Sequence, residues 1–105
     1  MNILFDQGTP APLRAMLTGH RVETAYERGW SSLSNGDLLT AAETASFDIF
    51  ITTDQQLHNQ HNLSGRRLAV VVLPTTRWRQ IRLHAADVVA AVESVQPGDY
   101  RELSW

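Results

Sequence analysis

The stretch IFITTD, residues 49–54, is an apolar run that ends in an aspartate, and it repeats the pattern of ILFD at residues 3–6. A short run in which nearly every residue is apolar is typical of a strand buried on both faces of a parallel sheet. If both runs are parallel strands of one sheet, their carboxyl ends lie at the edge where open α/β sheets bind ligands. We therefore expect Asp6 and Asp54 to share that edge. Either aspartate could instead end its strand or cap the following helix.

The rest of the chain alternates between strand and helix signals. Strand signals recur in three further stretches: residues 21–25, 68–73 and 100–105, the last as an edge strand. A first helix signal starts within residues 9–12, where proline suits a first turn, and continues over residues 13–17. Two more occur from Ser34 onward and over residues 78–95, where apolar residues recur at spacings of three and four. This alternation implies an α/β fold with a mostly parallel sheet of four to five strands and helices on both faces. Right-handed crossovers make 2-1-3-4 the simplest strand order, with the last strand beyond the fourth, so that the first and third strands are neighbours.

Length and composition narrow the class of protein. With 105 residues, of which 43% are apolar, the chain is expected to form one domain over residues 1–105. No apolar stretch approaches the roughly 20 residues of a membrane span, and the first residues do not resemble a signal peptide, so a cytoplasmic protein without membrane contact is expected. The absence of cysteine and lysine excludes disulfides, thiolate metal sites, cysteine nucleophiles and a catalytic lysine.

The charge of the chain is unevenly distributed. Between Gln55 and Ala86 there are five arginines and no acidic residue, so this window carries +5, whereas the whole chain carries −2 and the remainder therefore −7. Such asymmetry can attract phosphate groups to one face. The alternative is a solvated basic helix paired with acidic neighbours.

Five stretches together resemble a known family: residues 3–10 (ILFDQGTP), 19–25 (GHRVETA), 35–39 (NGDLL), 51–55 (ITTDQ) and 68–74 (LAVVVLP). They are similar to the short PIN-like domains, which are compact relatives of the VapC-type toxin ribonucleases. The resemblance spans nearly the whole chain and implies a doubly wound sheet with an acidic cluster at its carboxyl edge. In PIN nucleases that cluster holds Mg²⁺ or Mn²⁺ and cleaves a phosphodiester bond in RNA.

The resemblance transfers catalytic and metal-binding roles to three acids. Asp6 matches the acid after the first strand, Asp54 the acid after the third strand, and Asp37 the acid at the start of the second helix. Two acids common in such chains are replaced here, by Gln7 and Gln56. An amide oxygen can coordinate a cation but does not neutralise it, so the replacements argue against two-metal chemistry. Asp37 could equally serve only as a helix N-terminal charge.

Further polar residues are expected around the same crevice. The supporting set that could fix metal-bound waters or a phosphate comprises Gln7, Asn35, Thr52, Thr53, Gln55 and Gln56. Arg77 and Arg79 follow the fourth strand and are candidate phosphate or RNA contacts. Trp30, in a loop, is a candidate platform for stacking a base, whereas Glu43 is expected to face solvent. Each of these residues could also have no role beyond the fold.

Two functions are consistent with these residues. The first is a metal-dependent ribonuclease of PIN-like type, the toxin of a toxin–antitoxin pair, with Mg²⁺ or Mn²⁺, RNA and a cognate antitoxin as partners. The second is a PIN-like domain that binds RNA or protein without cleaving. A phospho-receiver domain also carries acids after strands 1 and 3, but it needs a lysine that this chain lacks. Residues 100–105 could pair with a second copy in a homodimer.

Overall fold

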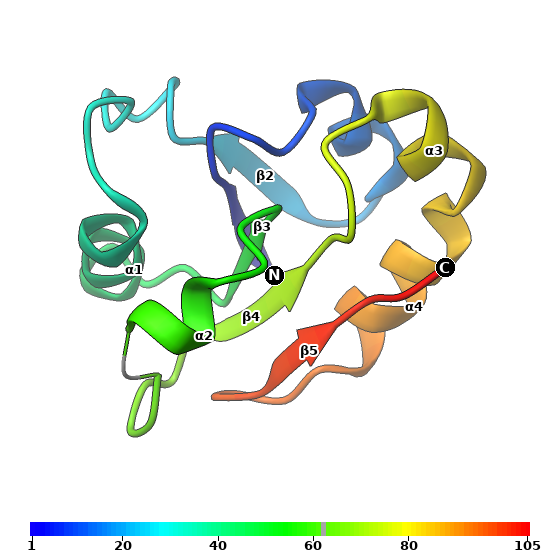
Figure 1. The fold of residues 1–105 in the computed structure, drawn as a ribbon. Helices are drawn as coiled ribbons and strands as arrows, with labels where there is room; N and C mark the ends of the chain where they lie inside the picture. The colour runs from blue at the N-terminus through cyan, green and yellow to red at the C-terminus, as the bar shows by residue number, and fades with distance from the viewer. Residues whose placement is uncertain (62) are drawn as a thin grey trace.

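Five parallel strands form one sheet in the order β2-β1-β3-β4-β5 (Figure 1). The computed structural model describes residues 1–61 and 63–105. The strands are β1 (Asn2–Phe5), β2 (Arg21–Thr24), β3 (Ile49–Thr52), β4 (Ala69–Val72) and β5 (Tyr100–Glu102). The predicted α/β class, the parallel sheet and the strand order are confirmed.

The sheet changes its winding direction between β1 and β3. In β1, Leu4 pairs with Glu23 of β2 on one side and with Phe50 of β3 on the other. The chain therefore adds β2 on one side of β1 and then crosses over to add β3, β4 and β5 on the other side. At such a switch point the following loops separate and leave a crevice at the carboxyl ends of the strands. Asp6 follows β1 and Asp54 lies two residues beyond β3, so both lie at this edge of the sheet.

Helices cover both faces of the sheet (Figure 1). They are η1 (Ala11–Met16), α1 (Asn35–Thr44), α2 (Leu57–Gln60), α3 (Trp78–Leu83) and α4 (Ala85–Ser94). One apolar core joins the sheet to η1, α3 and α4, with Leu13, Ile81 and Val88 among its members. A second core joins the opposite face to α1 and α2, with Leu38 and Leu57 among its members.

The two cores explain why the central strands are continuously apolar. Side chains alternate between the faces of a strand, so Ile3 and Phe5 enter the first core while Leu4 enters the second. All three side chains are completely buried. Burial of one such side chain contributes about 1.5–3 kcal/mol to folding, which makes both faces of β1 necessary for stability.

Two of the predicted helices differ in detail from the structure. The helix expected over residues 78–95 is two helices, because it is interrupted at His84, which has φ −112° and ψ 23°. The apolar stripe continues across the break, since Ile81, Val88 and Val92 all belong to the same core. The helix expected to start within residues 9–12 and to continue over residues 13–17 is the 3₁₀ helix η1, which begins at Ala11 and ends at Met16.

The beginning of α1 follows its local sequence. The Oγ of Ser34 accepts a hydrogen bond of 3.3 Å from the backbone N–H of Asp37, which satisfies one of the free donors of the first turn. This cap places Asn35 at the first position of the helix, directed toward the carboxyl edge of the sheet. Across the described residues, no helix is sufficiently long and apolar to span a membrane.

Candidate functional site

Asp6 lies at the end of β1 and is almost completely buried, with 5% of its surface exposed. Its Oδ1 accepts hydrogen bonds from the backbone N–H of Thr9 at 3.0 Å and from the Thr9 hydroxyl at 2.6 Å. Its Oδ2 accepts a third bond, of 2.6 Å, from the hydroxyl of Thr52. The turn after β1 and the end of β3 therefore hold this carboxylate in one orientation.

Asp54 is half-buried and is held by α1 and by its own loop. Its Oδ2 accepts a hydrogen bond of 2.9 Å from Nδ2 of Asn35, and its Oδ1 accepts one of 3.0 Å from the backbone N–H of Gln56. The backbone N–H of Asp54 itself donates to Oγ1 of Thr52 at 3.0 Å. One threonine hydroxyl thus links the loop that carries Asp54 to the carboxylate of Asp6.

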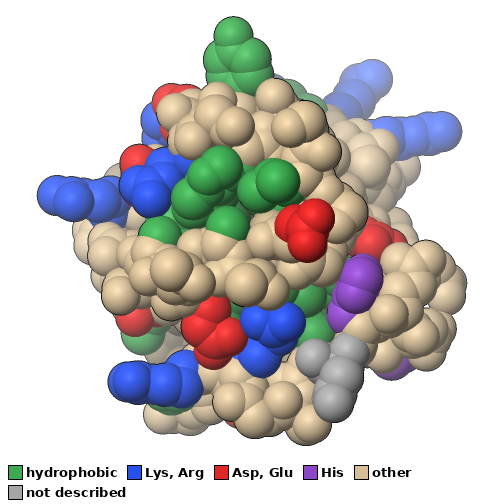
Figure 2. All heavy atoms as spheres, turned by 90° about the vertical axis from the view of Figure 1, so that its left-hand side faces the viewer, with side chains coloured by type: hydrophobic (Ala, Val, Ile, Leu, Met, Phe, Trp, Pro, Cys, Tyr) green, Lys and Arg blue, Asp and Glu red, His purple; other side chains and the backbone are tan. Residues whose placement is uncertain are grey.

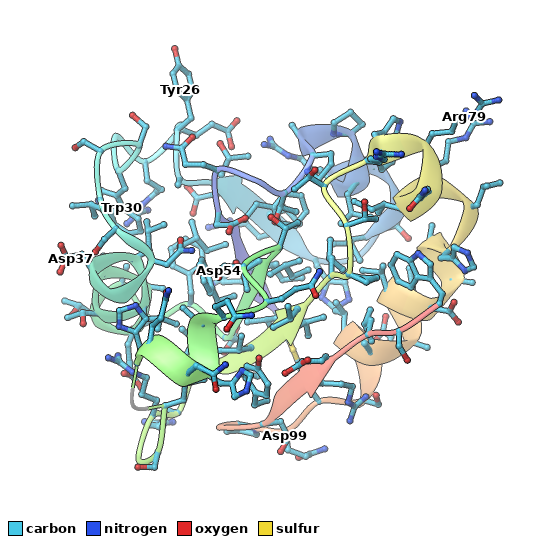
Figure 3. The ribbon with its side chains drawn as sticks, in the orientation of Figure 1. Tyr26, Trp30, Asp37, Asp54, Arg79 and Asp99 are labelled. Atoms are coloured by element: carbon cyan, nitrogen blue, oxygen red, sulfur yellow. The ribbon has the colours of Figure 1, made fainter. Side chains whose placement is uncertain are left out.

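The third acid of the predicted site lies apart from the other two. Asp37 is exposed in the first turn of α1. Figure 3 shows its side chain pointing outward, away from Asp54. In this position the negative charge of Asp37 interacts favourably with the positive N-terminal end of the helix dipole. The structure therefore brings together Asp6 and Asp54, but not Asp37.

The glutamines of the supporting set mainly connect loops. Gln7 Nε2 donates to the carbonyl of Ser31 at 2.7 Å, and Gln55 Nε2 donates to the carbonyl of Pro74 at 2.7 Å. The side-chain carbonyl of Gln56 accepts a bond from Nδ2 of Asn59 at 2.9 Å. These contacts give each glutamine a role in shaping the crevice. Because the glutamines are neutral, the charge of this set of residues comes from Asp6 and Asp54.

Thr53 lies against Gly8 in the loop after β1. A Cβ added to Gly8 would lie within 2.3 Å of the Thr53 hydroxyl oxygen. The close approach of the two loops therefore requires glycine at this position. The polar hydroxyls of Thr52 and Thr53 follow each other at the end of β3, but only Thr52 contacts an aspartate.

The two arginines predicted to contact phosphate lie at the beginning of α3. Arg77 precedes the helix and Arg79 is in its first turn, and both are exposed. Figure 3 shows Arg79 pointing into solvent, away from Asp54. Within residues 1–61 and 63–105, Arg77, Arg79 and Arg82 form no ion pair, whereas Arg66 of the same basic window pairs with Glu43 at 3.1 Å. Among the described residues, three of the four arginines of the window without an ion pair thus lie around α3, and the fourth is Arg67.

The opposite side of the molecule has no such separation of charge. Figure 2 shows the face formed around α1, on which acidic and basic side chains are interspersed. Trp30, the predicted stacking platform, is half-buried near this side. Its ring packs at 72° against Phe47, with the centroids 6.3 Å apart, and the Arg28 guanidinium lies 4.7 Å from its centre. The Arg28 guanidinium therefore already occupies one face of the Trp30 ring.

A group of titratable side chains beside Asp54 was not predicted from the sequence. Tyr100 Oη lies 3.0 Å from His58 Nδ1 and donates to Glu102 Oε1 at 3.0 Å. Burial raises the pKa of the Tyr100 hydroxyl, and the hydrogen bond to Glu102 and the negative charges of Glu102 and Asp54 raise it further. The group joins α2 to β5, which are about 40 residues apart in the chain. No local pattern in the sequence indicates that these two elements meet.

An open hollow of about 580 Å³ extends from Asp6 toward the loop after β2. It is lined by residues that follow β1 and β2, including Gly8, Arg14, Tyr26 and Glu27. Arg14 Nη2 lies 2.6 Å from Glu27 Oε1. The hydrogen bond from Arg14 lowers the pKa of the Glu27 carboxyl, with a further contribution from the backbone N–H of Thr24. The sequence offered no signal for this hollow, because it depends on how the two loops lie together.

The donor set of the crevice fits one hard cation better than two. In the described part of the chain, no group of three or more His, Asp or Glu side chains is placed to hold a metal ion. Asp6 and Asp54 nevertheless supply two carboxylates, and neither has an arginine or histidine in ion-pair distance among the described residues. Mg²⁺ is commonly bound through one or two carboxylates, with water and substrate phosphates completing its shell.

Comparison with known proteins adds no family assignment. The chain matches no protein-family model, and no curated protein and no solved structure is significantly similar to it. The resemblance to PIN-like domains therefore rests on the motifs, and the function must be argued from the site.

Proposed function

We propose that this chain is a PIN-like domain that cleaves RNA, using one Mg²⁺ or Mn²⁺ ion held by Asp6 and Asp54. The observation that carries the proposal is the placement of these two carboxylates at neighbouring strand ends, connected through the Thr52 hydroxyl and without a cationic partner in the described chain. Two carboxylates gathered at one edge repel each other unless a cation compensates their charge.

The side chains around the pair would keep it ready for the ion. Thr9 and Thr52 fix both oxygens of Asp6, and Asn35 fixes one oxygen of Asp54. Preorganised ligands need little rearrangement when an ion or substrate binds. The bound ion would lower the pKa of a water molecule and stabilise negative charge on the phosphoryl oxygens. Gln7 and Gln56, which replace acids of related chains, supply no charge for a second ion.

The proposed substrate follows from the charge around α3. Arg77, Arg79 and Arg82 are exposed and without ion pairs in the described residues, so they are available to attract phosphate groups from solution. Because Arg79 points away from Asp54, it would contact the RNA strand at a phosphate distant from the cleaved bond. An RNA strand, which carries a phosphate at each nucleotide, could contact both places.

A second candidate is a PIN-like domain that binds RNA or protein without cleaving. It is favoured by the burial of Asp6, whose carboxylate already accepts three hydrogen bonds, and by the separation of Asp37 from the crevice. The toxin role, the cognate antitoxin, the homodimer through β5 and the cytoplasmic location stay predictions in either case.

Cleavage of RNA by matched variants tests the proposal. A mixed pool of single-stranded RNA would be incubated with Mg²⁺ or Mn²⁺ and the wild type, Asp6→Asn, Asp54→Asn or Asp37→Asn protein. We expect cleavage by the wild type and by Asp37→Asn, and its loss in the other two. RNA binding without metal-dependent cleavage in any of the four proteins would support the second candidate instead.

A further inference from the structure

The hollow beside Asp6 has the dimensions of a ligand site. Its volume of about 580 Å³ lies within the usual range of small-molecule pockets, about 300–1,000 Å³. Most of its walls come from the turn after β1 and the loop after β2, and Asp6 is one of the lining residues. A group bound in the hollow would therefore be adjacent to Asp6, the first aspartate of the pair.

Tyr26 is an exposed aromatic side chain at the rim of this hollow. It is 77% exposed, and Figure 3 shows it projecting from the loop into solvent. The loop itself is well held, because the Gly29 N–H donates to the Tyr26 carbonyl at 3.0 Å and the Trp30 N–H donates to the Ala25 carbonyl at 2.8 Å. Tyr26 thus presents an open ring on a fixed backbone, whereas the half-buried ring of Trp30 packs against Phe47 and Arg28.

Glu27 supplies a hydrogen-bond acceptor in the same wall. Its Oε1 accepts bonds from Arg14 Nη2 at 2.6 Å and from the Thr24 N–H at 2.9 Å, while the Glu27 N–H donates to Thr24 Oγ1 at 3.1 Å. These bonds fix the carboxylate. Within the described chain, the other oxygen, Oε2, has no hydrogen-bond partner, so it is available to a ligand.

We infer that this hollow is a nucleobase subsite, in which Tyr26 stacks on the base and Oε2 of Glu27 accepts hydrogen bonds from its edge, with guanine preferred. Guanine presents two neighbouring N–H donors, which a carboxylate accepts well. Uracil presents one N–H between two carbonyl oxygens, which a carboxylate repels. Stacking on an aromatic ring provides affinity for any base, and Glu27 would provide the selection. The inference rests on the proposed action on RNA, and it assigns the base next to the cleaved phosphodiester.

The subsite can be tested without RNA chains or metal. Guanosine and uridine 5′-monophosphate would be titrated into the protein while the NMR signals of the backbone amides around the hollow are followed in every variant, and those of the Tyr26 ring in the wild type. We expect ring-current shifts of Tyr26 with guanosine monophosphate and a preference of about tenfold over uridine monophosphate. Tyr26→Ala should weaken guanosine monophosphate binding by about tenfold, whereas Tyr26→Phe should keep it, because phenylalanine also stacks.

The role of Glu27 has its own matched control. Glu27→Gln should abolish the preference for guanosine monophosphate, while Glu23→Gln should leave it unchanged, because Glu23 pairs with Arg28 and does not line the hollow. Equal binding of the two nucleotides by the wild type, or unchanged binding by Tyr26→Ala, overturns the subsite. Nucleotide selection by a protein that cleaves no RNA would overturn the proposed function alone. Cleavage without base preference, together with equal nucleotide binding, would overturn the subsite alone.

Discussion

The hydroxyl of Thr52 donates a hydrogen bond of 2.6 Å to Oδ2 of Asp6, which joins the end of β3 to the end of β1. The same hydroxyl accepts a bond of 3.0 Å from the backbone N–H of Asp54. Thr52 is completely buried. A single side chain thus positions both parts of the proposed site, although it need not touch a substrate itself.

Replacement of this threonine by valine should lower the stability of the protein. Thr52→Val keeps the branched shape but leaves Asp6 Oδ2 and the Asp54 N–H without their partner, so we expect unfolding free energy to fall by about 1–3 kcal/mol. Urea denaturation measures this change. The control is Thr40→Val on the exposed side of α1, which should stay within about 0.5 kcal/mol of the wild type. Equal effects of the two substitutions would show that the Thr52 bonds contribute little.

The contact of Gly8 with Thr53 predicts a specific pair of substitutions. Gly8→Ala would place its Cβ within 2.3 Å of the Thr53 hydroxyl oxygen, so we expect a loss of about 1–3 kcal/mol from overpacking. Thr53→Ala removes that oxygen and should make the Gly8→Ala substitution much less harmful. A double-mutant cycle measured by urea denaturation gives the coupling. Additive effects would contradict the close approach of these loops.

Tyr100 should make the protein less stable in alkaline solution. Its pKa is raised in the folded protein by burial, by the hydrogen bond to Glu102 and by the charges of Glu102 and Asp54, while in the unfolded chain it is about 10. Above pH 10 the unfolded state therefore releases a proton that the folded state keeps, and stability falls as pH rises.

The Tyr26→Phe variant leaves Tyr100 as its one tyrosine, so absorbance at 295 nm then reports this residue alone. The folded protein should ionise at a higher pH than the protein in 8 M urea. In the Tyr100→Phe variant, the alkaline loss of stability should be smaller. Identical titration of the folded and unfolded forms would contradict the structure.

Glu43 should contribute to stability at neutral pH and lose that contribution in acid. Partial burial alone would raise its pKa, but hydrogen bonds from the Arg67 and Leu68 N–H groups and from Arg66 outweigh this effect and lower the pKa. The contribution is therefore present above the unfolded value of about 4.3 and disappears as pH falls through the folded value. The expectation from the sequence that Glu43 faces solvent is therefore wrong, because its carboxylate is partly buried and hydrogen-bonded.

Substitution of Glu43 by glutamine isolates this contribution. We expect Glu43→Gln to lower the unfolding free energy at pH 7 by about 1 kcal/mol, because bonds to a charged acceptor become bonds to a neutral one. The difference from the wild type should shrink toward pH 3. The comparison in urea denaturation at both pH values is Glu93→Gln, at an exposed position of α4 where the carboxylate contacts only the His20 ring, at 3.2 Å, among the described residues. A difference that is constant with pH would contradict the assignment.

The fold was predictable because its main signals are local. Strands buried on both faces need continuous apolar runs, and these runs appear at residues 3–5, 49–52 and 69–72. Short connections and right-handed crossovers then leave few strand orders. The break at His84 was not predictable in this way, since the apolar stripe of Ile81 and Val88 continues across it.

The candidate site was only partly predictable. The positions of Asp6 and Asp54 follow from the ends of two neighbouring strands. The direction of Asp37 depends on the rotation of α1, which its cap does not determine. The contact between His58 and Tyr100 and the opening beside Tyr26 depend on how distant loops pack. Such contacts arise from tertiary structure and leave no periodic pattern in the sequence.

Calorimetric titration of Mn²⁺ into four proteins measures whether Asp6 and Asp54 together hold one ion. The wild type, Asp6→Asn, Asp54→Asn and Asp37→Asn proteins would be compared under the same conditions. We expect binding of one ion by the wild type and by Asp37→Asn, and a loss of at least about tenfold in affinity, 1.4 kcal/mol, in each of the other two. No binding by the wild type at millimolar metal, or equal binding by all four proteins, would contradict this expectation.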